Sequence, residues 1–135
     1  MKTHECVSFL IVEGDKVLLE KRSDSKKTDP GLITIPGGHI EFGESRIQAL
    51  FRELKEEVNI VPNGYHYLCS LYHPTNELQL IHYYIVSSWQ GDMISLEADE
   101  IDWHSVACAP VGIKADRVAL SEYDRIGHQL RQLSN

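Results

Sequence analysis

The chain has 135 residues, of which 42% are apolar and 24% are charged. This length and composition are typical of one globular domain, here residues 1–135, whose core needs no disulfide framework. The formal net charge of −7 argues against nucleic-acid binding by phosphate neutralisation. The apolar run Val7 to Val12 is too short for a signal peptide or a membrane span, so we expect a cytoplasmic protein without membrane contact.

The first half of the chain predicts two strands, a short third strand and a helix. Residues 5–13 and 16–22 are rich in aliphatic side chains and flank a tight turn at Gly14. A polar loop over 23–31 precedes a short strand over 32–36. Residues 45–58 then change to helical spacing, and Ser45 with Gln48 forms a capping-box pattern. The apolar stripe of this helix is Ile47, Leu50, Phe51, Leu54 and Val58.

The second half predicts three more strands and a final helix. The strands are residues 65–72, 78–89 and 101–106, and the second is long enough to be central in a sheet. From Ala115, apolar residues recur at helical spacing as far as Leu133. This order of elements indicates an α/β (α+β) fold in which helices pack on the faces of a mixed sheet.

Three carboxylates of the first helix, Glu53, Glu56 and Glu57, fall within a wedge of about 100°, displaced from the apolar stripe. Their like charges repel unless a divalent cation binds them or water solvates them. Oxygen ligands of this kind suit magnesium or manganese. Gly37 and Gly38 precede the helix and either form a tight turn or let the backbone approach a ligand. By composition alone, a solvated acidic face after a turn is the simpler interpretation.

The spacing of these residues resembles the signature box of the Nudix hydrolases. The matching positions are Gly38, Glu44, Arg52, Glu53, Leu54, Glu56, Glu57 and Ile60. The single departure is Asn59, where the family usually has glycine, and asparagine is the side chain that most readily accepts the left-handed conformation. The resemblance implies the α/β/α sandwich of the family.

The resemblance also implies a reaction, in which water attacks a phosphorus of a nucleoside diphosphate linked to a group X. It assigns metal ligation, by Mg²⁺ or Mn²⁺, to Glu53, Glu57 and the Gly38 carbonyl, and it makes Glu56 either a ligand or the base that accepts the water proton. Arg52 is expected to pair with Glu44 and hold the loop against the helix. Glu53→Gln or Glu57→Gln is expected to abolish hydrolysis and leave the fold intact.

Candidates outside the box are less specific. Glu41 is either a further ligand or a solvated loop residue. Family members often use an acid from a later loop, for which this chain offers Glu97 and Glu100, with Glu100 slightly favoured. Arg22, Gly37 and Gly38 are the candidates for phosphate contact. The alternative for Arg22 is that it is simply an exposed arginine at the end of a strand.

The remaining aromatic and imidazole side chains give no clear site. The seven histidines show no ligand pair, so each is assigned to the surface or to packing, and His39 alone lies in the glycine segment. The strand tyrosines 65, 67, 72, 83 and 84 are assigned to packing rather than to base stacking. The three cysteines, being odd in number and widely spaced, are interpreted as buried structural thiols.

We expect a small nucleotide as the substrate, in the first place a (deoxy)nucleoside triphosphate. ADP-ribose or a dinucleoside polyphosphate is the alternative, and Pro74 lies near where ADP-ribose hydrolases often place a proline. A Nudix module that binds nucleotide without hydrolysis is a third hypothesis, disfavoured because every box carboxylate is present. The family resemblance leaves a homodimer open.

Overall fold

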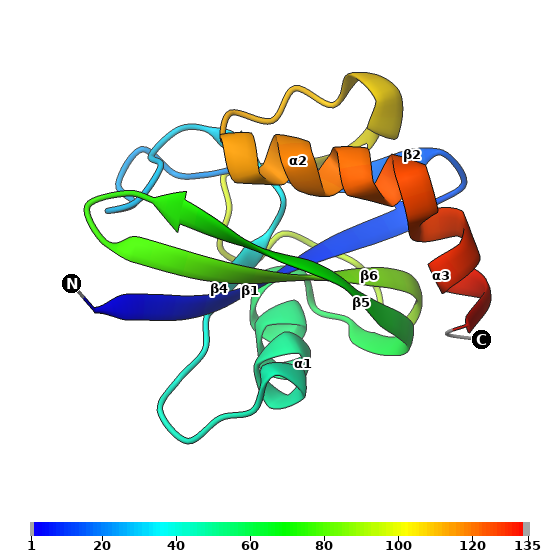
Figure 1. The fold of residues 1–135 in the computed structure, drawn as a ribbon, viewed down its shortest axis with the longest axis horizontal. Coiled ribbons are helices and arrows are strands. Elements are labelled where there is room, and N and C mark those ends of the chain that lie inside the picture. Colours follow the sequence, from blue (N-terminus) through cyan, green and yellow to red (C-terminus); the bar gives the residue numbers. More distant parts are fainter. Residues whose placement is uncertain (1, 134–135) are drawn as a thin grey trace.

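The computed structural model describes residues 2–133 as a mixed β-sheet between two helical layers. Helix α1 (Arg46–Val58) lies on one side of the sheet, and α2 (Lys114–Glu122) lies on the other (Figure 1). The predicted α/β/α sandwich is therefore confirmed.

The sheet of the described residues has seven strands, and its main path runs in the order β3-β2-β1-β6-β5. Strand β4 pairs with β1, and β7 pairs with β2. Only β1 and β6 pair in parallel among these neighbours, so the sheet is mixed as predicted. The bounds are β1 Thr3–Glu13, β2 Lys16–Lys21, β3 Ile33–Thr34, β4 Gly37–His39, β5 Val61–Pro74, β6 Leu78–Gln90 and β7 Glu100–Ser105.

Strands β1 and β6 are buried on both faces, which explains their nearly continuous apolar sequences. On one face, Leu10, Ile85 and Tyr83 pack with Leu120 and Tyr123 of the C-terminal helix. On the other face, residues such as Val7, Phe9, Ile11 and Val86 pack against α1. The alternation of side chains along each strand thus supplies both cores from the same two strands.

Helix α1 begins where the capping box predicts. Ser45 accepts a hydrogen bond from the Gln48 amide at 3.1 Å, and the Gln48 side chain accepts one from the Ser45 amide at 2.8 Å. The predicted apolar stripe is only partly correct. Leu50, Leu54 and Val58 are buried, but Ile47 is exposed and Phe51 is half-buried.

The buried face of α1 includes two of its carboxylates. Glu53 and Glu57 lie beside Leu54 and Val58 on this face rather than on a solvated surface. The stripe is rotated because one edge of the helix faces the cavity described below, where polar side chains are enclosed. A solvated acidic face is therefore the wrong interpretation for these two residues.

Asn59 ends α1 in the left-handed conformation, with φ of 63° and ψ of 35°. Its amide donates to the carbonyls of Leu54 and Lys55, which satisfies the end of the helix. Its side-chain amide donates to the Asp92 carbonyl at 3.1 Å. The expectation that asparagine replaces glycine for its backbone conformation is confirmed.

The C-terminal helix is continuous but irregular. Residues after α2 form a π-helical segment, Tyr123–Gly127, followed by α3, His128–Leu133. A Cβ at Gly127 would collide with the Tyr123 ring, so glycine lets the buried tyrosine pack against the backbone here. Helical spacing alone did not predict the wider turn.

The tight turn, one of the two alternatives for Gly37 and Gly38, is wrong, and so is the prediction for the cysteines. Gly37 and Gly38 lie in the short strand β4, hydrogen-bonded in register with Ser8 and Val7 of β1, and do not form a tight turn. Cys6 is buried and Cys69 is half-buried, but Cys108 is exposed, so the interpretation of all three as buried thiols is wrong. Within residues 2–133, no helix is long and apolar enough to cross a membrane.

Candidate active site

A cavity of about 270 Å³ lies between α1, β4 and the segments around residues 22–29 and 113–116. Its walls carry residues from distant parts of the chain, which the fold alone brings together. Most candidates of the sequence analysis are among its lining residues: Arg22, Gly37, Gly38, His39, Glu41, Glu53, Glu56, Glu57 and Glu97.

Glu53 and Glu57 are each only 7% exposed. Burial raises the pKa of Glu57 to about 9, with help from the negative charges of Glu20, Glu97 and Glu53. Burial also raises the pKa of Glu53, against the lowering effect of its hydrogen bond from Arg52. Burial and mutual repulsion make the charged forms of these carboxylates unfavourable. A cation bound between them would offset this cost.

Glu20 is a carboxylate that the sequence analysis did not identify. It lies buried on β2, and burial raises its pKa to about 7 against the lowering effect of Arg22. The Thr34 hydroxyl donates to it at 3.5 Å, and Arg22 Nη1 lies 3.8 Å from Glu20 Oε1. The signal in the sequence is a glutamate that directly follows the aliphatic run Val17 to Leu19.

The two glycines of β4 are required by close contacts rather than by unusual dihedral angles. A Cβ at Gly38 would fall on the Glu53 carboxylate, and one at Gly37 would collide with the Val7 carbonyl and the Ser8 side chain. The backbone of β4 therefore lies directly against the carboxylate of α1. A side chain at position 38 would therefore have to displace the Glu53 carboxylate.

Arg52 connects α1 to the segment before it. Its Nε and Nη2 atoms donate to the two oxygens of Glu44 at 2.7 and 2.9 Å, and Nη2 also donates to the His39 carbonyl at 3.0 Å. These hydrogen bonds hold the pKa of Glu44 at about 2. Nη1 donates to Glu53 and Glu56 at 2.9 and 3.0 Å, so one guanidinium orients three carboxylates.

The later acidic loop contributes Glu97 to the cavity, and its charge acts on both Glu53 and Glu57. Glu100 is not among the described lining residues; it begins β7, where it pairs with Lys21. The structure thus brings together the box and Glu97, whereas the sequence analysis slightly favoured Glu100.

Arg22 lies in the cavity wall, but its side chain is engaged with the following loop. Its Nε and Nη2 atoms donate to the carbonyl and hydroxyl oxygens of Thr28 at 3.0 and 3.2 Å. Glu41 is exposed at the cavity, with Oε1 3.6 Å from Arg52 Nη1. Both residues therefore line the cavity, Arg22 in its wall and Glu41 at its exposed side.

Asp116 lines the cavity and was not predicted from the sequence. It is 1% exposed and accepts hydrogen bonds from the Ile35 amide at 2.9 Å and the Tyr83 hydroxyl at 2.7 Å. Burial raises its pKa to about 6, despite these two donors. Its position in the first turn of α2 gave no sequence signal, because aspartate is common there for helix stability.

The residues around α1 fit a divalent metal ion. The donor set consists of oxygens from Glu53, Glu56 and Glu57 beside the Gly38 backbone, and two of these carboxylates are desolvated in a way that a cation relieves. Such ligands suit hard divalent ions. When bound, the ion can lower the pKa of water and neutralise charge on phosphoryl oxygens.

A family model for the NUDIX domain matches residues 2–123. The match covers the sheet, α1 and the cavity, together with α2. The chain therefore belongs to the Nudix family of pyrophosphohydrolases, enzymes that hydrolyse pyrophosphate bonds and generally use divalent metal ions.

Two curated relatives from Escherichia coli (strain K12) align over most of their length. The chain is 33% identical over 117 residues to an 8-oxo-dGTP diphosphatase, covering 85% of this chain and 86% of the relative. It is 31% identical over 111 residues to a CTP pyrophosphohydrolase, covering 82% and 78%. An ADP-ribose pyrophosphatase of Methanocaldococcus jannaschii is 40% identical over 58 residues, or 42% of this chain and 32% of that relative.

Solved structures share the fold. The crystal structure of a MutT NUDIX hydrolase from Burkholderia pseudomallei superposes with a TM-score of 0.82 at 23% identity, over 90% of this chain and 98% of that one. The solution structure of the E. coli ORF135 protein superposes with a TM-score of 0.80 at 27% identity, over 96% and 94%. These similarities extend well beyond the box.

Proposed function

We propose that this protein hydrolyses (deoxy)nucleoside triphosphates to the nucleoside monophosphate and pyrophosphate. The observation that carries the substrate class is the extent of the alignments. The two relatives that align over more than three quarters of both chains are named for 8-oxo-dGTP and CTP, whereas the ADP-ribose pyrophosphatase aligns over 42% of this chain. Substrate selectivity depends on residues throughout the domain, so the longer alignments carry more weight.

Glu53, Glu57, Glu56 and the Gly38 carbonyl hold the metal in this proposal, and Mg²⁺ or Mn²⁺ is the ion that their oxygens favour. Arg52 contacts the ligands Glu53 and Glu56, and Glu44 acts through Arg52, so both are positioning residues. Because Arg52 donates to both Glu53 and Glu56, it sets the orientation of these carboxylates. Arg22 and Gly37, in the cavity wall, contact the phosphate chain.

The attacking water forms a new bond to phosphorus, the bond to the bridging oxygen breaks, and the water gives its proton to a carboxylate. Glu56 and Glu97 both line the cavity and are exposed to water. Arg52 donates a hydrogen bond to Glu56 at 3.0 Å and another to Glu53 at 2.9 Å, which holds Glu56 beside the ligand Glu53 on α1. We therefore assign proton acceptance to Glu97 and metal ligation to Glu56.

A substrate panel tests the proposal. The purified protein is incubated with 8-oxo-dGTP, dGTP, CTP and ADP-ribose, each with Mg²⁺ or Mn²⁺, and the products are separated by ion-exchange chromatography. We expect nucleoside monophosphate and pyrophosphate from at least one triphosphate, with kcat/KM at least tenfold above that for ADP-ribose. Reaction in H₂¹⁸O identifies, by mass spectrometry, which phosphorus receives the water.

Glu57→Gln is the matched control, because it removes a ligand charge while keeping the side-chain shape. It should bind nucleotide yet show no hydrolysis with either ion. A higher kcat/KM for ADP-ribose would overturn the triphosphate assignment. Nucleotide binding without turnover under either ion would favour a binding module instead.

A further inference from the structure

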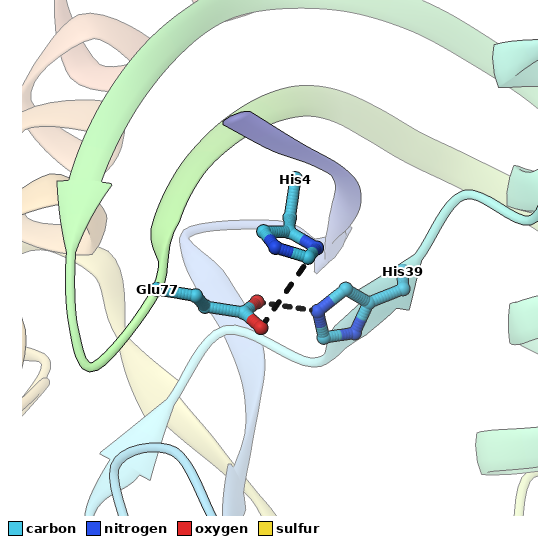
Figure 2. A group of neighbouring side chains, drawn as sticks. All are labelled: His4, His39 and Glu77. Carbon is cyan, nitrogen blue, oxygen red and sulfur yellow. Dashed lines mark hydrogen bonds and ion pairs between the residues drawn. The ribbon is translucent and has the colours of Figure 1, made fainter. Parts of the chain in front are cut away.

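Two histidines and a glutamate meet beside the active-site cavity. Figure 2 shows the side chains of His4, His39 and Glu77 pointing toward one another from three separate segments. His4 lies on β1, His39 ends β4, and Glu77 directly precedes β6. The sequence did not predict this group, because His4 and His39 are 35 residues apart and His39 and Glu77 are 38 residues apart.

The strand register explains the convergence. Cys6 of β1 pairs with His39 of β4, and His4 pairs with Gln79 of β6. Because side chains two residues apart share a face of a sheet, His4 lies on the same face as Cys6 and its partner His39. Glu77, two residues before Gln79, reaches the same face. The pairing of β4, β1 and β6 therefore fixes the three side chains at one end of the sheet.

The nitrogen and oxygen atoms of the group lie close enough to share one ion. His39 Nε2 is 2.6 Å from Glu77 Oε2, and His4 Nδ1 is 3.9 Å from Glu77 Oε1. One ligand atom from each residue lies within 4.8 Å of the others. Around a tetrahedral zinc ion, ligands at roughly 2.1 Å from the metal are about 3.4 Å apart. Shifts of about 1 Å in the side chains would give that spacing.

The surroundings permit such shifts and also hold the carboxylate in place. The His4 and His39 side chains are 38% and 50% exposed, so both rings can rotate. Glu77 is less exposed and accepts a hydrogen bond from Gln79 Nε2 at 3.0 Å, while its backbone amide bonds to the Thr75 hydroxyl at 3.0 Å. An outer hydrogen bond of this kind orients a ligating carboxylate.

We propose that His4, His39 and Glu77 form a second metal site, selective for Zn²⁺ or a similar imidazole-preferring ion. Imidazole nitrogen is a good ligand for zinc, whereas the oxygen ligands on α1 suit magnesium or manganese. Two histidines and a glutamate leave the fourth tetrahedral position for water or an anion. The ion replaces the proton that His39 and Glu77 share in their hydrogen bond.

The site adjoins the active-site cavity without using its carboxylates. His39 and Gln79 line the cavity, and the His39 carbonyl accepts from Arg52, but the ligating ring of His39 points to Glu77. A zinc ion here would connect β1, β4 and the turn before β6, and so stiffen the edge of the cavity next to Gly38.

Isothermal titration with Zn²⁺ tests the site. The protein carries no histidine tag, contains Cys108→Ser to remove the exposed thiol, and is saturated with Mg²⁺ to occupy the α1 carboxylates. We expect one Zn²⁺ per chain. His4→Ala, His39→Ala and Glu77→Gln should each raise the Kd about tenfold or more, and Co²⁺ should give the visible bands of a tetrahedral nitrogen and oxygen site.

His128→Ala and Glu57→Gln are the controls, since His128 is an exposed histidine on α3 and Glu57 belongs to the α1 cluster. Both should keep the wild-type Zn²⁺ affinity, and circular dichroism should show that all variants are folded. A wild-type Zn²⁺ affinity in His4→Ala, His39→Ala and Glu77→Gln would overturn the proposal. Loss of Zn²⁺ binding in Glu57→Gln would also overturn it. If the wild type binds no Zn²⁺ at millimolar concentration, the proposal is wrong and His39 and Glu77 form only a hydrogen bond.

Discussion

Glu57→Gln should stabilise the metal-free protein while destroying its function. The Glu57 carboxyl has an ordinary pKa of 4.5, and burial with neighbouring negative charges raises it to about 9 in the folded chain. The folded chain holds the Glu57 proton more tightly than the unfolded chain does. The contribution of this carboxyl to folding stability is therefore fully present below pH 4.5 and is lost as the pH rises toward 9. Glutamine holds no proton and escapes this loss.

The magnitude follows from the pKa difference. Above pH 4.5 the unfolded chain releases the proton while the folded chain keeps it, at a cost of about 1.4 kcal/mol per pH unit. The cost is about 3 kcal/mol at pH 7 and below 1 kcal/mol at pH 5. The variant should exceed the wild type in free energy of unfolding by these amounts.

Urea unfolding in EDTA at pH 5, 6, 7 and 8, followed by fluorescence, measures this difference. Glu56→Gln is the control, because it makes the same chemical change at the neighbouring residue of α1, whose side chain is 47% exposed. Saturating Mg²⁺ should then stabilise the wild type more than Glu57→Gln by mass action. A difference between Glu57→Gln and wild type that stays constant from pH 5 to 8 would refute this reasoning.

Three other predictions follow from the site and its supports. Gly38→Ala places a Cβ on the Glu53 carboxylate, so kcat/KM should fall about 100-fold with normal circular dichroism, and unchanged kinetics would contradict the close contact. Asn59→Ala should lower the free energy of unfolding by about 1 kcal/mol because of its positive φ, whereas Asn59→Gly should be nearly neutral, and urea unfolding compares them. Glu97→Gln should reduce kcat at least tenfold, while Glu100→Gln should resemble wild type in steady-state kinetics; the reverse result would return the catalytic assignment to Glu100.

The local features of this fold could be predicted from the sequence because they depend on near neighbours. The Ser45 and Gln48 capping box, the left-handed Asn59 and the strands β1 and β6 all arise from residues a few positions apart. The spacing from Gly38 to Ile60 likewise indicated the family before any contact was known. Long-range contacts could not be predicted in this way. Ile47 belongs to the predicted apolar stripe but is exposed, because its burial depends on which segments pack against α1.

The sequence by itself determined the family, the helix that carries the carboxylates and the pairing of Arg52 with Glu44. Only the tertiary structure decided that Glu53 and Glu57 are buried, that Glu20 and Asp116 join their surroundings, and that Glu97 rather than Glu100 lines the cavity. It alone brought His4 and His39 to Glu77. Burial and charge coupling depend on segments that are distant in the chain and adjacent in the sheet, and a pKa or a ligand set is a property of that three-dimensional neighbourhood.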